Sequence, residues 1–309
     1  FREFYDKLRD GERATTSAVN VSEFTAVMEE KLKAGLDILF IGFSSGLSTT
    51  YQSGAIACDE LREKYPERKL IAIDSLCASL GEGLLLYLAA KKQQSGASMD
   101  EVADYVRETI PHLCHWFTVN DLMFLKRGGR VDAATALVGT VLQIKPVMHT
   151  DDAGTLKNVT KARGRKASLI ALAEKALTTS TDLPSQTMFI CHGDCIEDAK
   201  YVENILKTKY GVKEVLINYT GAVIGSHSGP GTMALFFLVF LYTSPSGLVF
   251  YWTLNNIFSL IKTIFYKLKH PGRVLKILAA VAGTALLALG LVRYSFSERP
   301  VVKAALLLL

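Results

Sequence analysis

The feature that most constrains the fold is an alternation of short apolar runs with longer segments of helical periodicity. Short apolar runs bounded by turn residues are typical of buried strands, and the segments between them are long enough for amphipathic helices. This alternation predicts an α/β fold, in which helices cover the faces of a sheet. The predicted strands are Leu36–Gly42, Leu70–Ile73, Thr187–Cys191 and Glu214–Ile217, and the predicted helices are Ser22–Ala34, Gly54–Lys64, Gly81–Gln94, Met99–Ile110 and Arg163–Ala176.

Composition allows a sizeable core and excludes several classes of protein. The chain has 309 residues, of which 49% are hydrophobic and 21% charged, which is enough for two domains. Its net charge of +5 is too diffuse for a nucleic-acid-binding protein, and no zinc-finger or helix-turn-helix pattern is present. The scattered cysteines indicate reduced thiols. The segment CHGDC at Cys191–Cys195 lacks the fourth well-spaced ligand of a zinc site, so we expect no metal.

The segment Ile217–Thr232, INYTGAVIGSHSGPGT, places one histidine in a run of glycines and hydroxyls after a short apolar strand. Glycines let backbone N–H groups approach a ligand closely, and the polar side chains add donors. The pattern predicts an anion-binding loop, and the alternative is a polar turn between a strand and a helix. The glycines are Gly225, Gly229 and Gly231, and the donors are Ser226, His227 and Ser228.

A second polar loop, FSSGLSTTYQS at Phe43–Ser53, lies between a predicted strand and a predicted helix. Hydroxyls at a helix N-terminus lie where the macrodipole favours negative charge, and N-capping alone requires only one of them. The loop has neither the Lys-Ser/Thr ending of a nucleotide P-loop nor acidic neighbours for magnesium, so anion binding is favoured over phosphotransfer. The candidate donors are Ser45, Ser48, Thr49 and Thr50.

These loops belong to a set of blocks through which residues 1–237 resemble the DegV family, bacterial proteins similar to the fatty-acid-binding subunit of fatty acid kinase. Seven blocks occur in the family's order, which makes the match highly specific. They are ATTSAVN at Ala14–Asn20, FSSGLSTTYQS at Phe43–Ser53, AIDS at Ala72–Ser75, LKRGGR at Leu125–Arg130, IKPV at Ile144–Val147, KARGRKA at Lys161–Ala167 and VIGSHSGPGT at Val223–Thr232.

The resemblance implies two α/β lobes, at residues 1–113 and 114–237, that hold one long-chain fatty acid between them. It places the acyl tail in an apolar tunnel and the carboxylate at the polar loops. The protein would present that carboxylate to a separate fatty acid kinase catalytic subunit, which makes an acyl phosphate from ATP. The chain would then be a cytoplasmic, non-catalytic binding subunit without a cofactor.

Carried over block by block, the resemblance places the fatty acid carboxylate near Thr16, Ser48, Arg163 and His227, with Ser45 as a further donor. A carboxylate held away from water needs charge-assisted or multiple hydrogen bonds, and arginine would be the strongest partner. For Arg163 the alternative is a solvated basic face, because KARGRKA has four basic residues in seven. The expected supporting loop consists of Gly225, Ser226, Gly229 and Gly231.

Two positions depart from the family's pattern. The second block usually reads Ser-Gly-Thr, whereas this chain has Thr49 at the glycine position, and a β-carbon there could crowd a ligand or forbid a positive φ. The first block usually has Gln where this chain has Ala18. Both departures put the head-group geometry in question.

Apolar residues of the second lobe are candidates for the acyl tunnel, although ordinary core packing is the commoner role for each of them. A sixteen-carbon tail could gain roughly ten kcal/mol from burial before entropy costs. The candidates are Phe117, Leu122, Met123, Phe124, Leu125, Leu137, Val138, Val141 and Leu142.

The two ends of the sequence raise separate expectations. The chain begins at Phe1 rather than Met, and the resemblance implies an earlier strand, so we expect the first lobe to lack that strand. Residues 238–309 form a hydrophobic tail in which Ser244–Lys262 resembles the last transmembrane segment of YidC-type insertases. Two candidate spans, 247–265 and 277–292, allow membrane association. If the lobes are cytoplasmic, the basic loop after the first span lies outside the cell, whereas the positive-inside rule keeps basic loops in the cytoplasm. Because of this conflict, a fusion of two unrelated reading frames is a further hypothesis.

Two alternatives to fatty acid binding come from other classes of protein. One is a membrane-protein fragment with an insertase-like tail and a soluble passenger or sensor domain. The other is an enzyme with Ser48 as nucleophile and His227 as general base, which no identifiable third residue supports.

Overall fold

The computed structural model describes residues 1–131, 144–180 and 182–238, which all lie in one compact unit, Phe1–Leu241. The predicted strands and helices are confirmed, with ends that differ by a few residues. The helices are α1 (Arg2–Arg9), α2 (Val21–Lys33), α3 (Thr50–Lys64), α4 (Leu80–Gln94), α5 (Met99–Thr109), α6 (Leu122–Arg127), α8 (Arg165–Thr179), α9 (Ile196–Tyr210) and α10 (Ala222–Ser228). The strands are β1 (Ile38–Gly42), β2 (Leu70–Asp74), β3 (Leu113–Thr118), β4 (Ile144–Thr150), β5 (Leu156–Arg163), β6 (Thr187–His192), β7 (Glu214–Tyr219) and β8 (Met233–Leu238).

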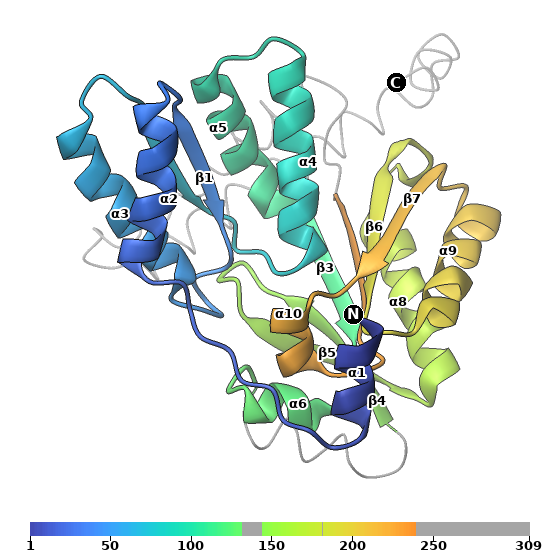
Figure 1. Ribbon diagram of the computed structural model, residues 1–309. Helices are drawn as coiled ribbons and strands as arrows, with labels where there is room; N and C mark the ends of the chain where they lie inside the picture. Colours follow the sequence, from blue (N-terminus) through green and yellow to red (C-terminus); the bar gives the residue numbers. More distant parts are fainter. Residues whose placement is uncertain (132–143, 181, 239–309) are drawn as a thin grey trace, which may run out of the picture. The chain divides into compact units, whose positions relative to one another are not determined.

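Strands β1 and β2 form a parallel pair, with Ile38 opposite Leu70 and Gly42 opposite Asp74. Parallel neighbours need a crossover connection, which α3 supplies. Helices α2 and α3 pack on one side of this pair and α4 and α5 on the other (Figure 1). Burial on both faces explains why these strands are continuous apolar runs in the sequence.

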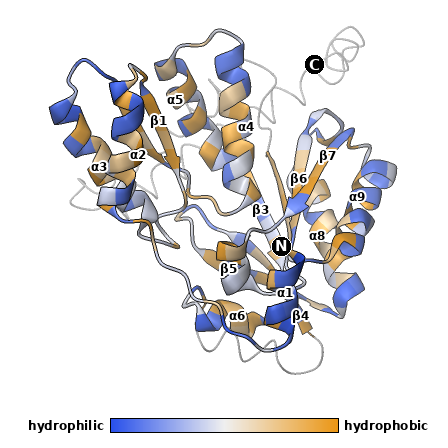
Figure 2. Ribbon diagram, viewed as in Figure 1, coloured by the Kyte–Doolittle hydropathy of each residue, from blue (hydrophilic) through white to orange (hydrophobic). Residues whose placement is uncertain are grey.

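The remaining six strands form a mixed sheet in the order β5-β4-β3-β8-β6-β7. Strands β6 and β7 are parallel and are joined through α9, whereas the other neighbours are antiparallel. Helices α8 and α9 bury their apolar sides against one face, where Leu172, Ile190 and Leu206 belong to one core. In Figure 2 the hydrophilic sides of both helices face outward.

Helix α4 takes part in the cores of both sheets. Its Leu84 and Leu85 pack with Phe189 and Phe236 on the other face of the six-stranded sheet. Farther along the same helix, Ala89 packs against the β1–β2 pair. The helix therefore connects the two sheets directly.

Helix α1 and the segment after it contact residues between Asp194 and His227. Tyr5 is fully buried, and its hydroxyl donates to the carbonyl of Thr220 at 2.7 Å. An ion pair of 2.7 Å joins Arg9 to Asp194. From α1 the chain runs in an extended path to α2, whose N-terminus has a capping box formed by Asn20 and Glu23. This path brings the block ATTSAVN next to α10.

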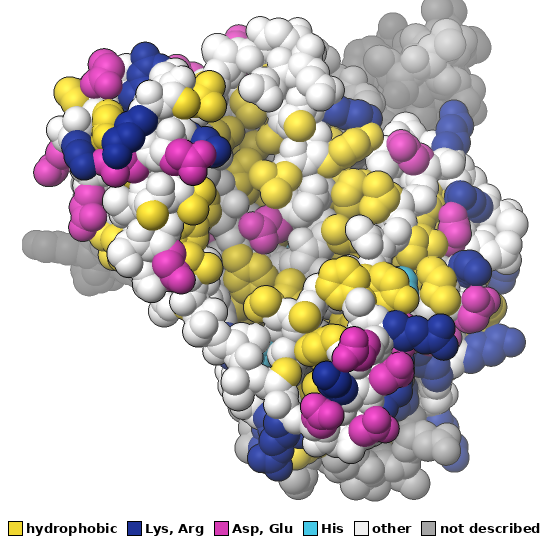
Figure 3. Space-filling view, viewed as in Figure 1, with side chains coloured by type: hydrophobic (Ala, Val, Ile, Leu, Met, Phe, Trp, Pro, Cys, Tyr) yellow, Lys and Arg dark blue, Asp and Glu magenta, His cyan; other side chains and the backbone are white. Residues whose placement is uncertain are grey.

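Hydrophobic side chains gather in the hollow at the centre of the face shown in Figure 3, and most charged side chains lie around it. Among the residues that the structure describes, no helix is both long enough and apolar enough to cross a bilayer. The candidate membrane spans at 247–265 and 277–292 lie outside the described residues.

Candidate functional site

A cavity of about 1170 Å³ lies against the six-stranded sheet, on the face opposite α8 and α9. The extended segment that follows α1, the loops after β1 and β2, and the helices α6 and α10 line it together with the sheet. Ligand pockets are typically about 300–1,000 Å³, so this cavity has room for a long ligand.

The floor of the cavity is mainly apolar. Phe117, Ala234 and Phe236 come from adjacent strands of the sheet, and Phe124 and Leu125 of α6 line it as well. Three of the candidate tunnel residues thus line the cavity. Of the others, Leu122 and Met123 pack in the adjoining core, and Leu137, Val138, Val141 and Leu142 lie outside the described residues.

Thr16 and His227, two of the predicted carboxylate-binding residues, are in direct contact at the cavity. The hydroxyl Oγ1 of Thr16 lies 2.8 Å from Nε2 of His227, although the residues are 211 positions apart in the sequence. Burial, and after it the positive charge of Arg130, lower the pKa of His227 below its usual range. The histidine is therefore neutral at physiological pH and forms a polar pair with the threonine.

The loop after β1 brings Ser45 and Ser48 to the same cavity. The Oγ of Ser48 lies 2.8 Å from Oγ1 of Thr50 and accepts from the backbone N–H of Thr50 at 3.2 Å. The backbone N–H of Ser45 donates to Asp74 of the AIDS block. Thr49 does not require a positive φ, because its φ is −77°, a value that any residue adopts, but its side chain does line the cavity.

Arg130 is a site residue that the sequence reasoning missed. Its guanidinium donates to the carbonyl of Leu47 at 3.0 Å and to the carbonyl of Gly128. Within the described part of the chain, it forms no ion pair with a carboxylate, and it is half-buried at the cavity. The signal for it in the sequence is the block LKRGGR at Leu125–Arg130, one of the seven blocks of the resemblance.

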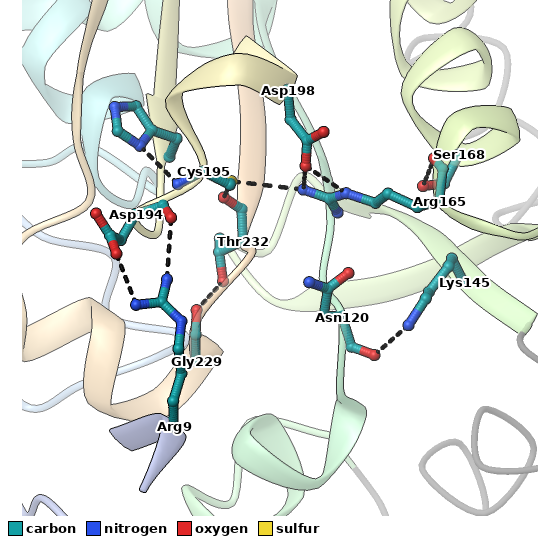
Figure 4. Close-up of polar contacts among 11 residues, drawn as sticks. Arg9, Asn120, Lys145, Arg165, Ser168, Asp194, Cys195, Asp198, Gly229 and Thr232 are labelled. Atoms are coloured by element: carbon teal, nitrogen blue, oxygen red, sulfur yellow. Dashed lines mark hydrogen bonds and ion pairs between the residues drawn. The ribbon is translucent and has the colours of Figure 1, made fainter. Parts of the chain in front are cut away.

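The structure does not bring Arg163, the fourth of the residues predicted to bind the carboxylate, to this cluster. Arg163 ends the edge strand β5, is exposed, and is not among the described residues that line the cavity. The next arginine, Arg165, is held by Asp198 at 2.8 Å and lies 3.5 Å from the sulfur of Cys195 (Figure 4). The alternative reading of KARGRKA as a basic face fits the exposure of Lys161 and Arg163.

The glycines of the histidine-containing segment pack closely against neighbouring side chains. Residues 222–228 form helix α10, so Gly225 lies within a helix. A β-carbon at Gly225 would lie 2.6 Å from the hydroxyl of Tyr5, and one at Gly229 would lie 2.6 Å from the ring of Phe124. Gly231 is crowded in the same way by Asn120. None of the three is among the described lining residues, whereas Ser226 is.

Positive charge predominates at the cavity. Its described lining includes Arg13, Arg127 and Arg130 but only one carboxylate, that of Glu12. A cavity with this balance attracts an anion to its polar side.

The segment CHGDC forms a turn held by its own hydrogen bonds. The backbone N–H of Cys195 donates to Nδ1 of His192 at 3.1 Å, and Cys195 contacts the carbonyl of Thr232 (Figure 4). Residues 1–131, 144–180 and 182–238 contain no group of three potential metal ligands placed to hold an ion.

Comparisons with known proteins agree on one family. The model of the family described as "Uncharacterised protein, DegV family COG1307" matches residues 1–239. A DegV domain-containing protein of Clostridium perfringens is 47% identical over 235 residues, which cover 76% of this chain and 81% of that protein. The insertase-like tail lies beyond the residues that the family model matches.

Solved structures with a similar fold include proteins from several bacteria. A DegV family protein of Thermus thermophilus, whose structure is described as showing fatty acid binding, has a TM-score of 0.69 at 29% identity and covers 77% of this chain and 84% of its own. The fatty acid kinase B3 protein of Streptococcus pneumoniae, loaded with linoleic acid, has the same TM-score at 18% identity and covers 77% and 83%. At that identity, the second likeness shows the fold alone.

Proposed function

This chain belongs to the DegV family and has its α/β fold, and on that premise we propose that it binds one long-chain fatty acid in the cavity. The observation that carries the proposal is the contact between Thr16 and His227 beside Arg130, at the polar side of a largely apolar cavity. The description of the Thermus relative as fatty-acid-binding supports it.

The head group would bind through the polar side chains that meet at the cavity. Arg130 has only carbonyl partners among the described residues, so its remaining N–H groups can donate to a carboxylate. The hydroxyls of Thr16 and Ser48 add neutral donors, and the carboxylate would favour the protonated form of His227. Several donors are needed, because a carboxylate that loses its water must recover those hydrogen bonds.

The acyl tail would supply most of the affinity. Burial of each methylene group contributes about 0.8 kcal/mol, and the floor formed by Phe117, Ala234 and Phe236 is apolar. The head-group cluster would then determine which way the chain lies in the cavity.

We further propose that the protein presents the bound carboxylate to a separate kinase and does not itself catalyse a reaction. The geometry argues against Ser48 and His227 as a nucleophile and its base. Among the described residues, Ser48 pairs with Thr50, and the partner of His227 is Thr16, so no carboxylate orients the histidine. The proposal of a separate kinase partner is supported only by the likeness in fold to the fatty acid kinase B3 protein.

Lipid extraction from the purified full-length chain tests the binding proposal. Denaturing extraction and mass spectrometry should recover about one fatty acid per chain, and delipidated protein should bind oleic acid again. Absence of fatty acid from folded, delipidated protein after incubation with oleic acid would remove the proposal.

The position of the head group is tested by two arginine variants. Arg130→Ala should weaken oleic acid binding about tenfold or more, as expected for loss of a hydrogen bond to a charged group. Arg163→Ala is the matched control and should change the affinity by less than about twofold, because Arg163 is exposed on the edge strand. If instead Arg163→Ala weakened oleic acid binding and Arg130→Ala did not, Arg163 would be the residue that binds the carboxylate. Titration of each variant with oleic acid, monitored by calorimetry, measures the difference.

A further inference from the structure

The floor of the cavity contains a polar side chain that the proposed head-group site does not use. His115 of β3 is 4% exposed and lines the cavity. Its Nδ1 is buried and has no hydrogen-bond partner. An unpaired polar atom in such a place destabilises the protein by about 1–3 kcal/mol, so the residue needs an explanation.

A second polar side chain, that of Thr150, lines the same cavity. On β3 and β4, Trp116 lies opposite His149 and Phe117 opposite Met148, and His115 and Thr150 are the next residues along the two strands beyond these pairs. Both His115 and Thr150 line the cavity. On the other side of β3, His115 lies opposite Phe236, whose ring meets the imidazole edge to face at 5.4 Å between ring centres. A polar spot thus interrupts an apolar floor.

This polar spot is built by different elements from those of the head-group cluster. The imidazole of His115 lies beneath the first turn of α4, where a β-carbon on Gly81 would lie 2.5 Å from its Cε1. His227, by contrast, lies on α10 and contacts Thr16 in the segment after α1. A ligand that fills the cavity would therefore meet two separate polar regions.

The chemistry of the spot favours a hydroxyl group. Burial lowers the pKa of His115 to about 3, so the ring is neutral and offers one N–H donor and one acceptor nitrogen. Thr150 adds a hydroxyl that can also donate or accept. A neutral pair of this kind cannot offset the desolvation of a second carboxylate, whereas an alcohol both donates and accepts and needs no charge.

We propose that the cavity accepts an acyl chain that carries a hydroxyl group along its length, and that His115, together with Thr150, binds that hydroxyl. The inference rests on the proposed fatty acid binding and names a class of ligand within it.

Competition between matched fatty acids tests this inference. Delipidated full-length protein is incubated with an equimolar mixture of ricinoleic acid and oleic acid, which differ only in a mid-chain hydroxyl. A second mixture contains ω-hydroxypalmitic and palmitic acids, which places the hydroxyl at the far end of the chain. After repurification, mass spectrometry gives the bound ratio. The protein should prefer the hydroxylated member of at least one pair by about fivefold, the effect of one neutral hydrogen bond.

Substitution of His115 assigns the preference to that residue. In His115→Phe the preference for the hydroxylated acid should be lost, because the alcohol would no longer have the imidazole as a partner while oleic acid would meet a more apolar floor. His115→Gln keeps a donor and an acceptor and should retain part of the preference. Phe117→Leu, on the same strand and face, changes the cavity without changing its polar groups and should leave the preference for the hydroxylated acid in place. Circular dichroism melts check that each variant is folded.

The outcomes separate this inference from the function on which it rests. If the protein binds oleic and ricinoleic acids equally, and ω-hydroxypalmitic and palmitic acids equally, the hydroxyl site is wrong while fatty acid binding stands. A preference that survives in His115→Phe would also overturn the assignment to His115. If the folded protein binds none of the four acids, the proposed function fails as well.

Discussion

At the scale of single residues, the site depends on contacts between parts of the chain that are far apart in sequence. Thr16 and His227 could both be predicted from the resemblance, and the structure brings them together. The sequence could not distinguish the roles of Arg130 and Arg163. Each is a basic residue in a polar block, and such a block looks the same in sequence whether the side chain faces a cavity or the solvent. Their difference arises from position: Arg163 ends an edge strand, and Arg130 follows a helix that lines the cavity.

The contact between His227 and a bound carboxylate should appear as proton uptake. In the free protein, burial and Arg130 lower the pKa of His227, and a carboxylate beside the ring would raise it. The complex then holds more protons than the free protein between the two pKa values, so affinity should rise as the pH falls through that interval. Calorimetric binding of oleic acid near neutral pH, in two buffers with different ionisation enthalpies, measures this uptake. His227→Gln should abolish the uptake, and an unchanged value in that variant would assign it to another group.

At the scale of elements, the predicted helices and strands were confirmed, but other elements were not predicted, among them α9, α10, β3 and β8. The clearest contrast between sequence and structure is α10. Its sequence AVIGSHS reads as a loop because glycine and serine are poor helix formers. The helix forms because of tertiary contacts: Gly225 allows the close approach of Tyr5, whose hydroxyl donates to the carbonyl of Thr220, two residues before the helix. Strand β3 was missed because its sequence LCHWFT is neither an alternating pattern nor a continuous apolar run: His115 and Thr118 interrupt it, although all six residues are buried.

The packing of α1 on α10 can be tested with two glycine variants. Gly225→Ala should lower the free energy of unfolding by about 1–3 kcal/mol, because the new β-carbon would lie 2.6 Å from the hydroxyl of Tyr5. Gly221→Ala, at the N-cap of the same helix, meets nothing within 4 Å and should cost less, about 0.5–1 kcal/mol, because alanine is only a poorer N-cap residue than glycine. Urea denaturation of both variants measures the difference. Equal stabilities would show that α1 does not pack as described.

At the scale of the whole described structure, buried histidines should make the protein sensitive to acid. The histidines of the described residues all have pKa values below their usual range, chiefly because of burial, and His115 has a pKa of about 3. Below about pH 6.5 the unfolded chain therefore binds more protons than the folded chain. The free energy of unfolding should then fall as the pH falls. The slope is about 1.4 kcal/mol per pH unit for each histidine that is charged only in the unfolded chain. These residues are His112, His115, His149, His192 and His227.

One carboxyl group opposes this trend. Burial raises the pKa of Glu82 to about 7, so its folded form keeps a proton that the unfolded form loses, and this contribution to stability falls as the pH rises toward 7. A single glutamate does not outweigh five histidines, so the net change follows the histidines. Urea denaturation at about pH 7.5 and about pH 5.5 measures it, and His115→Phe should reduce the loss on acidification. Stability that increased toward acid would show that the histidines are not buried as described.

The double packing of α4 has a consequence for how a ligand could be exchanged. Because Leu84 and Ala89 tie the same helix into the cores of both sheets, swinging the sheets apart would break two cores at once. The segment that follows α1, by contrast, has no helix or strand and is held at the cavity through Thr16. Detachment of that segment is the cheaper route, so loading and release should be as fast as a local opening and should not wait for a domain motion.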